Sequence, residues 1–191
     1  MRFDHFDFLA PLYDRVIPLP EDSRLVDVIA LPISGRLLDA AGGTGRIAQR
    51  LVDLAGLVVV ADASMKMLRQ ASSKVNLCCM VGSKTERLPF PDASFERVIV
   101  VDAFHHLADQ ARSLGEFWRV LAPGGRLVIE EPDIRHFGVK LVALVEKLAL
   151  FRSHFVPAEK IAARLNDLGA RTSVHREGYA VWVVGERESQ L

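Results

Sequence analysis

Short apolar runs alternate with stretches of helical periodicity between residues 36 and 130, and no other feature limits the fold as strongly. The apolar runs cover residues 36–40, 57–62, 76–81, 95–101 and 125–130. Strands that are apolar at almost every position are typical of a parallel sheet whose two faces are both covered by helices. The alternation therefore predicts an α/β fold built around such a sheet.

The C-terminal part of the chain departs from this rhythm. Two helical patterns, over residues 139–154 and 157–168, are followed by short strand-like runs at 171–175 and 179–184. Gly178 lies between the two runs, which is typical of a hairpin. We expect this hairpin to lie at the edge of the sheet.

The N-terminal part contains two helical candidates, at residues 6–16 and 21–30, before the first strand. The sequence has no internal repeat and no stretch typical of a linker. Its 191 residues fall within the ~100–200 that are usual for one domain. We therefore expect a single domain, in which residues 1–33 form a helical cover and residues 132–168 a helical insertion that contributes to an acceptor pocket.

Charge and hydropathy narrow the range of partners. The 24 Lys and Arg residues balance 24 Asp and Glu residues, so the composition gives no sign of the basic face that nucleic-acid binding requires. The longest apolar stretch, residues 139–151, contains Lys140, Glu146 and Lys147 and is shorter than the ~20 residues of a membrane span. We expect no nucleic-acid partner and no membrane span.

The two cysteines, Cys78 and Cys79, are neighbours in the third expected strand. Adjacent residues of a strand point to opposite faces, so these two thiols are not placed to pair with each other. Unpaired cysteines are typical of a reducing compartment. We expect both side chains in the strand core of a cytoplasmic protein.

A glycine-rich turn, Asp39-Ala-Ala-Gly-Gly-Thr-Gly45, joins the first expected strand to a helix. Glycines let the backbone turn tightly and approach a ligand, and the helix N-terminus offers N–H groups to an anion. Asp62 ends the second strand, 19 residues after Gly43, where its carboxylate can accept hydrogen bonds from ribose hydroxyls. A plain turn, with Asp62 capping the next helix, is the alternative. The order strand, turn, helix, strand favours the ligand.

The turn alone leaves the kind of ligand open. Residues 43–48 satisfy the dinucleotide pattern G-x-G-x-x-A, so an NAD-dependent oxidoreductase is one interpretation. A Tyr-x-x-x-Lys pair is absent, since Tyr13 and Tyr179 are the only tyrosines. A catalytic domain for such an enzyme is not evident either.

Four segments in order resemble the class I S-adenosylmethionine-dependent methyltransferases. They are Leu37-Leu-Asp39 leading into the glycines, Val60-Ala-Asp-Ala-Ser-Met65, Leu88-Pro-Phe-Pro-Asp-Ala-Ser-Phe95 and Arg119-Val-Leu-Ala-Pro-Gly-Gly125. The resemblance covers residues 36–131 and is strongest to the branch that contains quinone-biosynthesis C-methyltransferases. It implies a three-layer α-β-α sandwich with a Rossmann-like, mostly parallel seven-stranded sheet and an antiparallel edge strand near the C-terminus.

The resemblance also implies a set of residues that contact S-adenosylmethionine. In it, Asp39 lies near the methionine amino group, Asp62 binds the ribose, and residues 82–84 read the adenine. The full set is Tyr13, Asp39, Ala41, Gly42, Gly43, Gly45, Asp62, Ala63, Met67, Gly82, Ser83, Lys84, Val101 and His106. No metal site is expected.

Three positions depart from the family pattern. Ala41 stands where glycine is frequent, and Arg97 replaces an acidic residue before the core of the fourth strand. Ser83 stands where an Asp commonly accepts a hydrogen bond from the adenine amino group. Exchanging a charged for a neutral hydrogen bond weakens binding by ~1 kcal/mol.

Catalytic candidates follow the fourth strand. His105 and His106 come at the carboxyl edge of the sheet, where α/β proteins bind ligands, and an imidazole is a suitable base near neutral pH. The two histidines can equally form a pocket wall or cap the next helix. Asp102 is a third candidate, which would position an amine or a hydroxyl. Glu130 and Glu131 suggest a solvated loop rather than a metal pair.

The leading hypothesis is methyl transfer from S-adenosylmethionine to a small, apolar or aromatic acceptor, with S-adenosylhomocysteine as product. Apolar residues are frequent between positions 132 and 156. They indicate an apolar or aromatic acceptor, a homodimer interface or packing against the sheet. The alternatives are the NAD-dependent oxidoreductase and a methyltransferase-like domain that binds the cofactor without turnover.

Overall fold

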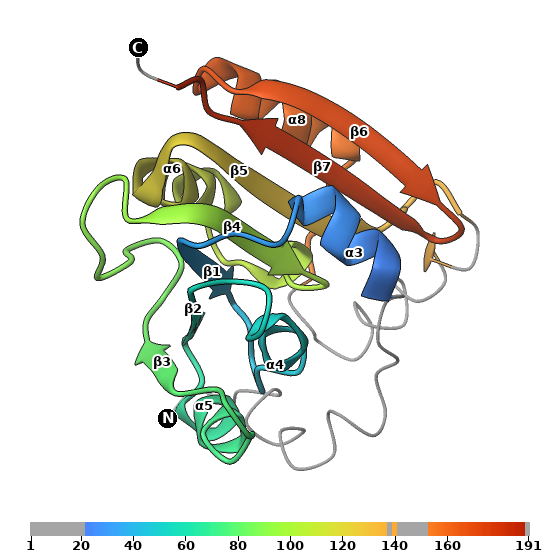
Figure 1. Cartoon of the computed structure of the whole chain (residues 1–191). Helices are drawn as coiled ribbons and strands as arrows, with labels where there is room; N and C mark the ends of the chain where they lie inside the picture. The colour runs from blue at the N-terminus through green and yellow to red at the C-terminus, as the bar shows by residue number, and fades with distance from the viewer. Residues whose placement is uncertain (1–21, 137–138, 141–152, 190–191) are drawn as a thin grey trace.

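A seven-stranded sheet, in the order β3-β2-β1-β4-β5-β7-β6, runs through the centre of the molecule (Figure 1). The computed structural model describes residues 22–136, 139–140 and 153–189. The strands are β1 (Arg36–Ala40), β2 (Leu57–Asp62), β3 (Cys79–Gly82), β4 (Phe95–Val101), β5 (Leu121–Pro132), β6 (Arg171–Glu177) and β7 (Ala180–Glu186).

Strands β1 to β5 pair in parallel, and β7 pairs antiparallel with both β5 and β6. This confirms the mostly parallel seven-stranded sheet with antiparallel pairing near the C-terminus. The antiparallel strand β7 lies one position inside the edge, and β6 is outermost. β1 pairs with β2 on one side and β4 on the other, so the direction of strand addition reverses there.

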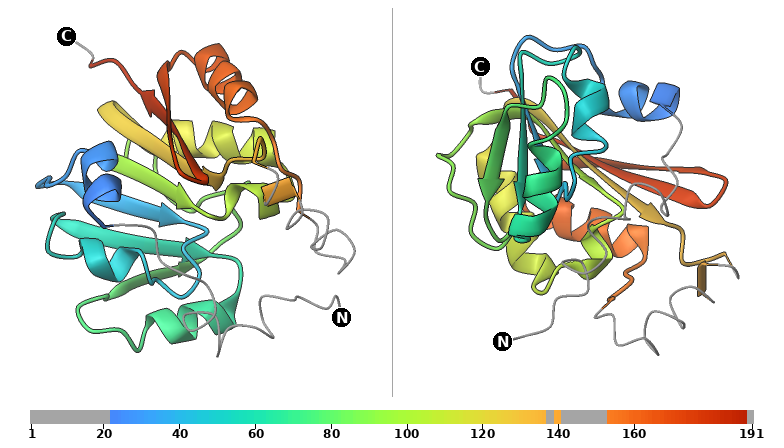
Figure 2. Two further views of the ribbon diagram at one scale, coloured as in Figure 1. Left: turned by 90° about the vertical axis from the view of Figure 1, so that its right-hand side faces the viewer. Right: turned by 90° about the horizontal axis from the view of Figure 1, so that it is seen from below.

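Helices cover both faces of the sheet and give the three layers seen in Figure 2. The helical segments are α3 (Asp22–Ile29), α4 (Ala48–Leu51), α5 (Met65–Ala71), η1 (Phe104–His106), α6 (Gln110–Val120) and α8 (Ala158–Asp167). Apolar residues of α3, α4 and α5 pack in one core cluster, and those of η1, α6 and α8 in the other. The strands carry apolar residues into both clusters, which explains their continuous apolar sequence.

Local capping groups set several helix starts. The hydroxyl of Ser64 accepts a hydrogen bond from the Met67 amide at 3.2 Å and so caps the N-terminus of α5. Asp109 plays the same part for α6 by accepting from the Arg112 amide at 3.0 Å. Because Asp109 is the cap, α6 begins at Gln110.

The arginine that departs from the family pattern fastens a helix. Arg97 donates from Nε to the Ile29 carbonyl at 2.7 Å and from Nη2 to the Ala30 carbonyl at 3.1 Å. Arg126 donates to the Val28 carbonyl at 2.9 Å. These bonds satisfy carbonyls at the C-terminal end of α3, which have no partner inside the helix.

Four expectations were wrong or lie outside the described residues. Cys78 is exposed rather than in the strand core, because β3 begins only at Cys79. Residues 153–157 are not helical, so the expected helix at 139–154 does not extend to its end. Most of that helix, and the helical candidate at residues 6–16, lie outside the described residues.

Candidate functional site

The expected ligand-binding residues gather at the carboxyl ends of β1, β2 and β4. These strands meet where β1 is flanked by β2 and β4, and in open α/β sheets ligands bind at such a switch point. The loop after β1 supplies the glycine-rich turn, and the loop after β4 supplies Asp102 and η1. The structure thus brings together segments that are about 60 residues apart in the chain.

The glycine-rich turn has three residues in the left-handed region of the backbone map. They are Ala41 at φ 57°, Gly43 at φ 54° and Gly45 at φ 68°. Only Ala41 carries a side chain there, in a conformation that costs an L-residue ~1–2 kcal/mol. No heavy atom lies within 4 Å of the place that a Gly43 Cβ would occupy. The backbone at Gly43 is therefore open to an approaching ligand.

Asp39 lies underneath this turn and is almost completely buried, with 1% of its surface exposed. Its Oδ2 atom makes no hydrogen bond within the described part of the chain. Burial and the nearby charge of Asp62 raise the pKa of Asp39 to about 7, although the Ala48 amide hydrogen-bonds it. Gly42 is required here, because a Cβ would lie 2.6 Å from the Asp39 Cγ.

Asp62 connects the turn to the next helix. Its Oδ2 accepts a hydrogen bond from the Gly43 amide at 2.9 Å, and its Oδ1 accepts one from the Ser64 amide at 2.7 Å. Each carboxylate oxygen can accept a second hydrogen bond, so both retain capacity toward a ligand hydroxyl. Asp62 is therefore both a structural clamp and a suitable acceptor for a ribose.

The loop after β3 holds its serine differently from the expectation. The Ser83 hydroxyl lies 3.0 Å from the carbonyl oxygens of Lys84 and Arg87, so its proton is used inside the loop. The Ser83 amide donates to the Asp62 carbonyl at 2.9 Å. The hydroxyl oxygen keeps lone pairs for an amino group, while its conformation is set by the loop.

The other expected contact residues are spread around this edge. Ala63, Gly82 and Lys84 are exposed, and Val101 is half-buried at the end of β4. Met67 is only 2% exposed, because it lies on the buried side of α5. Tyr13 lies outside the described residues.

The end of β4 is acidic and contains one buried cation. Arg46 forms an ion pair with Asp102 at 3.7 Å, and Asp102 has a φ of 51°. Glu130 lies beside them on β5, and burial together with the charges of Asp102 and Glu131 raises its pKa to about 8. The carboxyl groups of Asp39, Asp62, Asp102 and Glu130 thus share one region, and a cationic ligand would be attracted there.

Glu131 organises the turn that carries the histidines. Its Oε1 accepts from the Phe104 amide at 2.9 Å, and its Oε2 accepts from the His105 amide at 3.2 Å. The same Oε2 lies 2.7 Å from His105 Nδ1. The expectation of a solvated loop at Glu130 and Glu131 was therefore wrong, because the two are 8% and 5% exposed.

Two rings lie against the His105 ring. Its centroid lies 3.9 Å from that of His106 and 4.2 Å from that of Phe155, which is almost parallel to it. His106 is half-buried, and its Nδ1 lies 3.2 Å from the Ser153 hydroxyl. Burial and the adjacent His105 lower the pKa of His106 to about 3, so its ring is neutral at physiological pH.

Comparison with known proteins gives a consistent result. The family model described as "Methyltransferase domain" matches residues 38–129, which contain the glycine-rich turn and both strand-end aspartates. Residues 38–129 thus carry the sequence pattern of a methyltransferase domain. The methyltransferase domain thus coincides with the part of the sheet that builds the site.

Relatives of this chain include a demethylmenaquinone methyltransferase from Thermus thermophilus, 37% identical over 139 residues. That match covers 66% of this chain and 63% of the relative. A ubiquinone/menaquinone biosynthesis C-methyltransferase UbiE from Pasteurella multocida is 38% identical over 105 residues, which cover 50% of this chain and 39% of the relative. The chain spans less than two thirds of the length of either protein.

Solved structures agree on the fold. The YcgJ protein of Bacillus subtilis has a TM-score of 0.76 at 16% identity, and the match covers 88% of this chain and 98% of that one. A possible histamine N-methyltransferase of Thermotoga maritima has a TM-score of 0.74 at 20% identity, covering 96% and 98% of the two chains. The relatives named here give no support to the NAD-dependent oxidoreductase.

Two absences hold for the part of the chain that the structure describes. No helix within residues 22–136, 139–140 and 153–189 is long and apolar enough to cross a membrane. Over the same ranges, no three His, Cys, Asp or Glu side chains are grouped to hold a metal ion.

Sequence reasoning missed the structural parts of Arg46 and Glu131. Arg46 follows the glycines, and its pairing with Asp102 bridges 56 positions, which no local pattern reveals. Glu131 had one signal, namely its position at the carboxyl end of an apolar strand. Carboxylates at that position of a parallel sheet lie at the edge where ligands bind, and this position was a reason to expect a buried Glu131.

Proposed function

We propose that this chain transfers a methyl group from S-adenosylmethionine to a small aromatic acceptor and releases S-adenosylhomocysteine. One observation carries the proposal: the buried Asp39, whose Oδ2 has no hydrogen-bond partner among the described residues, lies against Gly42, next to the open backbone of Gly43. A buried polar atom without a partner is costly, and a ligand that supplies a donor removes that cost. Membership of the methyltransferase family supports this assignment.

The charge of the site fits the cofactor. S-adenosylmethionine carries a sulfonium and an ammonium group, and the region contains the carboxyl groups of Asp39, Asp62, Asp102 and Glu130. A cation close to these groups favours their ionised forms. Binding is therefore expected to lower the pKa values of Asp39 and Glu130 from about 7 and about 8.

We assign the contacts as follows. Asp39 and the backbone of Ala41, Gly42, Gly43 and Gly45 face the methionine part, and Asp62 accepts from the ribose hydroxyls. Ala63, Gly82, Ser83 and Lys84 border the adenine, while Val101 and His106 lie toward the methyl group. Tyr13 closes the site from the N-terminal segment, and Met67 supports the adenine wall from the core.

The acceptor is proposed to be an aromatic ring of the quinol type. The relatives named demethylmenaquinone methyltransferase and quinone-biosynthesis C-methyltransferase support a ring carbon as the methylated atom. His105 stacks on Phe155 and lies beside the tilted ring of His106, so three rings gather at the same edge of the sheet. Offset stacking against such rings favours a planar acceptor.

The bound cofactor supplies an electrophilic methyl group on a sulfonium that is already a good leaving group. The chain's own task is to align the acceptor and exclude water, an effect worth up to ~7–11 kcal/mol. We assign His106 as a neutral hydrogen-bonding group next to the acceptor, because its pKa of about 3 makes it a weak base. His105 is a positioning residue, since its Nδ1 is engaged by Glu131. Asp102 orients Arg46.

Calorimetric titration of the full chain with S-adenosylhomocysteine tests the cofactor assignment. We expect saturable 1:1 binding that Asp62→Asn weakens by about tenfold or more, because two ribose hydrogen bonds to a charged group are lost. Asp53→Asn, at an exposed position away from the site, is the matched control. Absence of saturable binding at millimolar ligand would overturn the proposal.

A second assay separates the alternatives. Radiolabelled S-adenosylmethionine is incubated with the chain and a panel of hydroquinones and phenols, and label in the organic extract is counted. Labelled product supports methyl transfer. Saturable S-adenosylhomocysteine binding without any labelled product favours the non-catalytic domain, and saturable quenching of nicotinamide fluorescence without binding of either sulfur ligand favours the oxidoreductase.

Three broader predictions accompany this function. We propose that residues 1–191 act as one domain, with residues 1–33 as a cover and residues 132–168 next to the acceptor. A cytoplasmic location and the lack of a nucleic-acid partner also stay predictions. A homodimer stays a prediction that the oligomeric state in solution tests.

A further inference from the structure

Four charged residues form a row across the amino-terminal edge of the sheet, opposite the methyltransferase site. Arg97 of β4 pairs in register with Arg126 of β5. Glu186 of β7 pairs with Arg126 on one side and with Arg171 of β6 on the other. Residues directly opposite one another on neighbouring strands lie on the same face of a sheet. The row, which we call the guanidinium row, therefore collects three guanidinium groups and one carboxylate.

One carboxylate is shared within this row. Glu186 Oε1 accepts from Arg126 Nη2 at 2.6 Å, and Glu186 Oε2 accepts from Arg171 Nη2 at 2.5 Å. Arg97 donates to the backbone carbonyls of Ile29, Ala30 and Glu96 instead. The row thus has an excess of positive charge in a chain whose formal net charge is zero.

The two arginines that face each other directly are an unfavourable pair. Like charges at opposed positions on neighbouring strands destabilise a sheet. The pKa of Arg97 is lowered by burial and by the charge of Arg126. An anion between the two guanidinium groups would offset the repulsion between them and would raise the pKa of Arg97.

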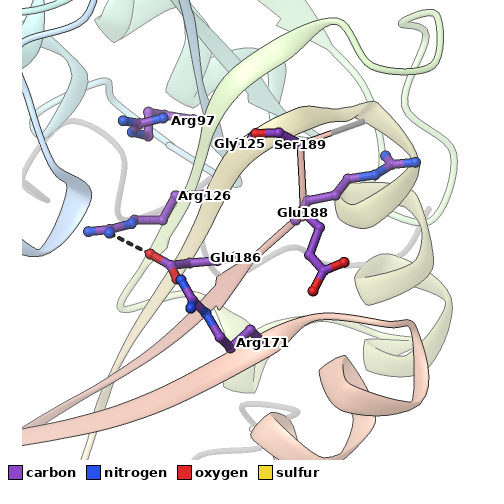
Figure 3. A pocket seen from close by; sticks show the side chains of 9 residues that line it. Arg97, Gly125, Arg126, Arg171, Glu186, Glu188 and Ser189 are labelled. Carbon is purple, nitrogen blue, oxygen red and sulfur yellow. Dashed lines mark hydrogen bonds and ion pairs between the residues drawn. The ribbon is translucent and has the colours of Figure 1, made fainter. Parts of the chain in front are cut away.

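A hollow lies over the row and leaves room for such an anion. It has a volume of about 350 Å³, and Figure 3 shows Arg97 and Arg126 projecting in the same direction above Glu186, with Arg171 on the other side of that carboxylate. Glu188 and Arg187 also line it. The Arg187 guanidinium donates to the carbonyls of Trp118 and Leu121.

We propose that the guanidinium row binds the diphosphate group of a small molecule. Guanidinium groups present paired N–H donors that match phosphate oxygens, and three of them around one hollow suit a ligand with adjacent negative charges. Fastening the end of α3 accounts for the bonds of Arg97 and Arg126 to backbone carbonyls. It does not account for Arg171, whose side chain is 80% exposed and forms an ion pair with the Glu186 carboxylate.

Titration calorimetry of the full chain with inorganic pyrophosphate at low ionic strength tests this site. We expect saturable 1:1 binding that weakens as salt is added, because exposed charges are screened. Arg171→Gln is expected to weaken binding about tenfold, the loss of one charge-assisted hydrogen bond. Arg69→Gln, on the exposed face of α5, is the matched control and should bind like the wild type.

A second variant distinguishes binding from simple structural support. Glu186→Gln removes the internal counter-charge but keeps the shape, so pyrophosphate should bind more tightly. The proposal is overturned if the wild type shows no saturable binding, if the two arginine variants weaken it equally, or if folded Glu186→Gln binds no better. S-adenosylhomocysteine binding, measured in parallel, should be unchanged in Arg171→Gln, so this result is independent of the proposed methyl transfer.

Discussion

Asp39 is a carboxyl group held in a place where its charged form is poorly tolerated. Its side chain is almost completely buried, and Asp62 adds a second negative charge nearby. The group therefore stays protonated in the folded chain to a much higher pH than in the unfolded chain. Burial of the Asp39 carboxyl group therefore lowers the stability of the folded chain, and we expect this group to take part in ligand binding.

Asp39 makes stability depend on pH in a defined direction. Its pKa rises from 3.8 when unfolded to about 7 when folded, so the folded state binds more protons between these values. The contribution of Asp39 to stability is then greatest below pH 4, falls as the pH rises toward 7, and is level above it. Asp39→Asn should remove this loss and be more stable than the wild type at pH 8 by on the order of 3 kcal/mol.

Urea unfolding at pH 5 and pH 8 measures this difference. Asp53→Asn at an exposed position serves as the control and should change stability equally at both pH values. Glu130 contributes a fall of the same sign up to about pH 8, so some pH dependence remains in the variant. A stability gain of Asp39→Asn that is equal at pH 5 and pH 8 would contradict the buried-acid interpretation.

Two adjacent glycines of the turn have different reasons to be glycine. At Gly42 a Cβ would lie 2.6 Å from the Asp39 Cγ, whereas at Gly43 it would meet nothing within 4 Å. Gly42→Ala should therefore lower stability by about 1–3 kcal/mol through overpacking. Gly43→Ala should cost about 1–2 kcal/mol, from its left-handed φ alone.

Ligand binding separates the same two variants more clearly. The added methyl of Gly43→Ala occupies the space proposed for the cofactor, so S-adenosylhomocysteine affinity should fall more than tenfold, a loss of about 1.4 kcal/mol or more. Calorimetry on the folded variant measures this. Wild-type affinity in Gly43→Ala would show that the ligand does not approach the turn there.

At the scale of elements, the short helix η1 depends on one residue of the neighbouring strand. Glu131 of β5 accepts hydrogen bonds from two backbone amides of η1 and contacts the His105 ring. The turn has few other ways to satisfy those amides, because both are buried. The position of the His105 ring is therefore set by Glu131 of strand β5 and not by the loop that carries His105.

Glu131→Gln should destabilise the chain by about 2–4 kcal/mol. Its amide group cannot accept all three hydrogen bonds, so buried donors of η1 are left without an acceptor. Glu159→Gln, at a side chain that is 60% exposed, should stay within about 0.5 kcal/mol of the wild type. Urea denaturation of both variants measures the contrast, and equal effects would refute the assigned part of Glu131.

Across the whole molecule, local signals predicted the strands and the turn but not the pairings between distant segments. The apolar runs predicted the strands of the sheet. The spacing from Gly43 to Asp62 predicted that both residues lie at the edge of the sheet where the ligand binds. The Arg46–Asp102 pair and the guanidinium row depend on strand order and register, which no single segment contains. The sequence pattern also missed that β5 begins at Leu121, because Pro123 and two glycines interrupt the apolar pattern there.

Strand β7 also decides when the sheet can be completed. It is the last strand along the chain, yet it lies between β5 and β6 and supplies Val181 and Val183 to one core cluster and Trp182 and Val184 to the other. Until residue 186 has left the ribosome, β5 keeps an unpaired edge and both clusters lack residues. Folding of this chain is therefore completed only after synthesis of β7, and the nascent chain needs protection from association until then.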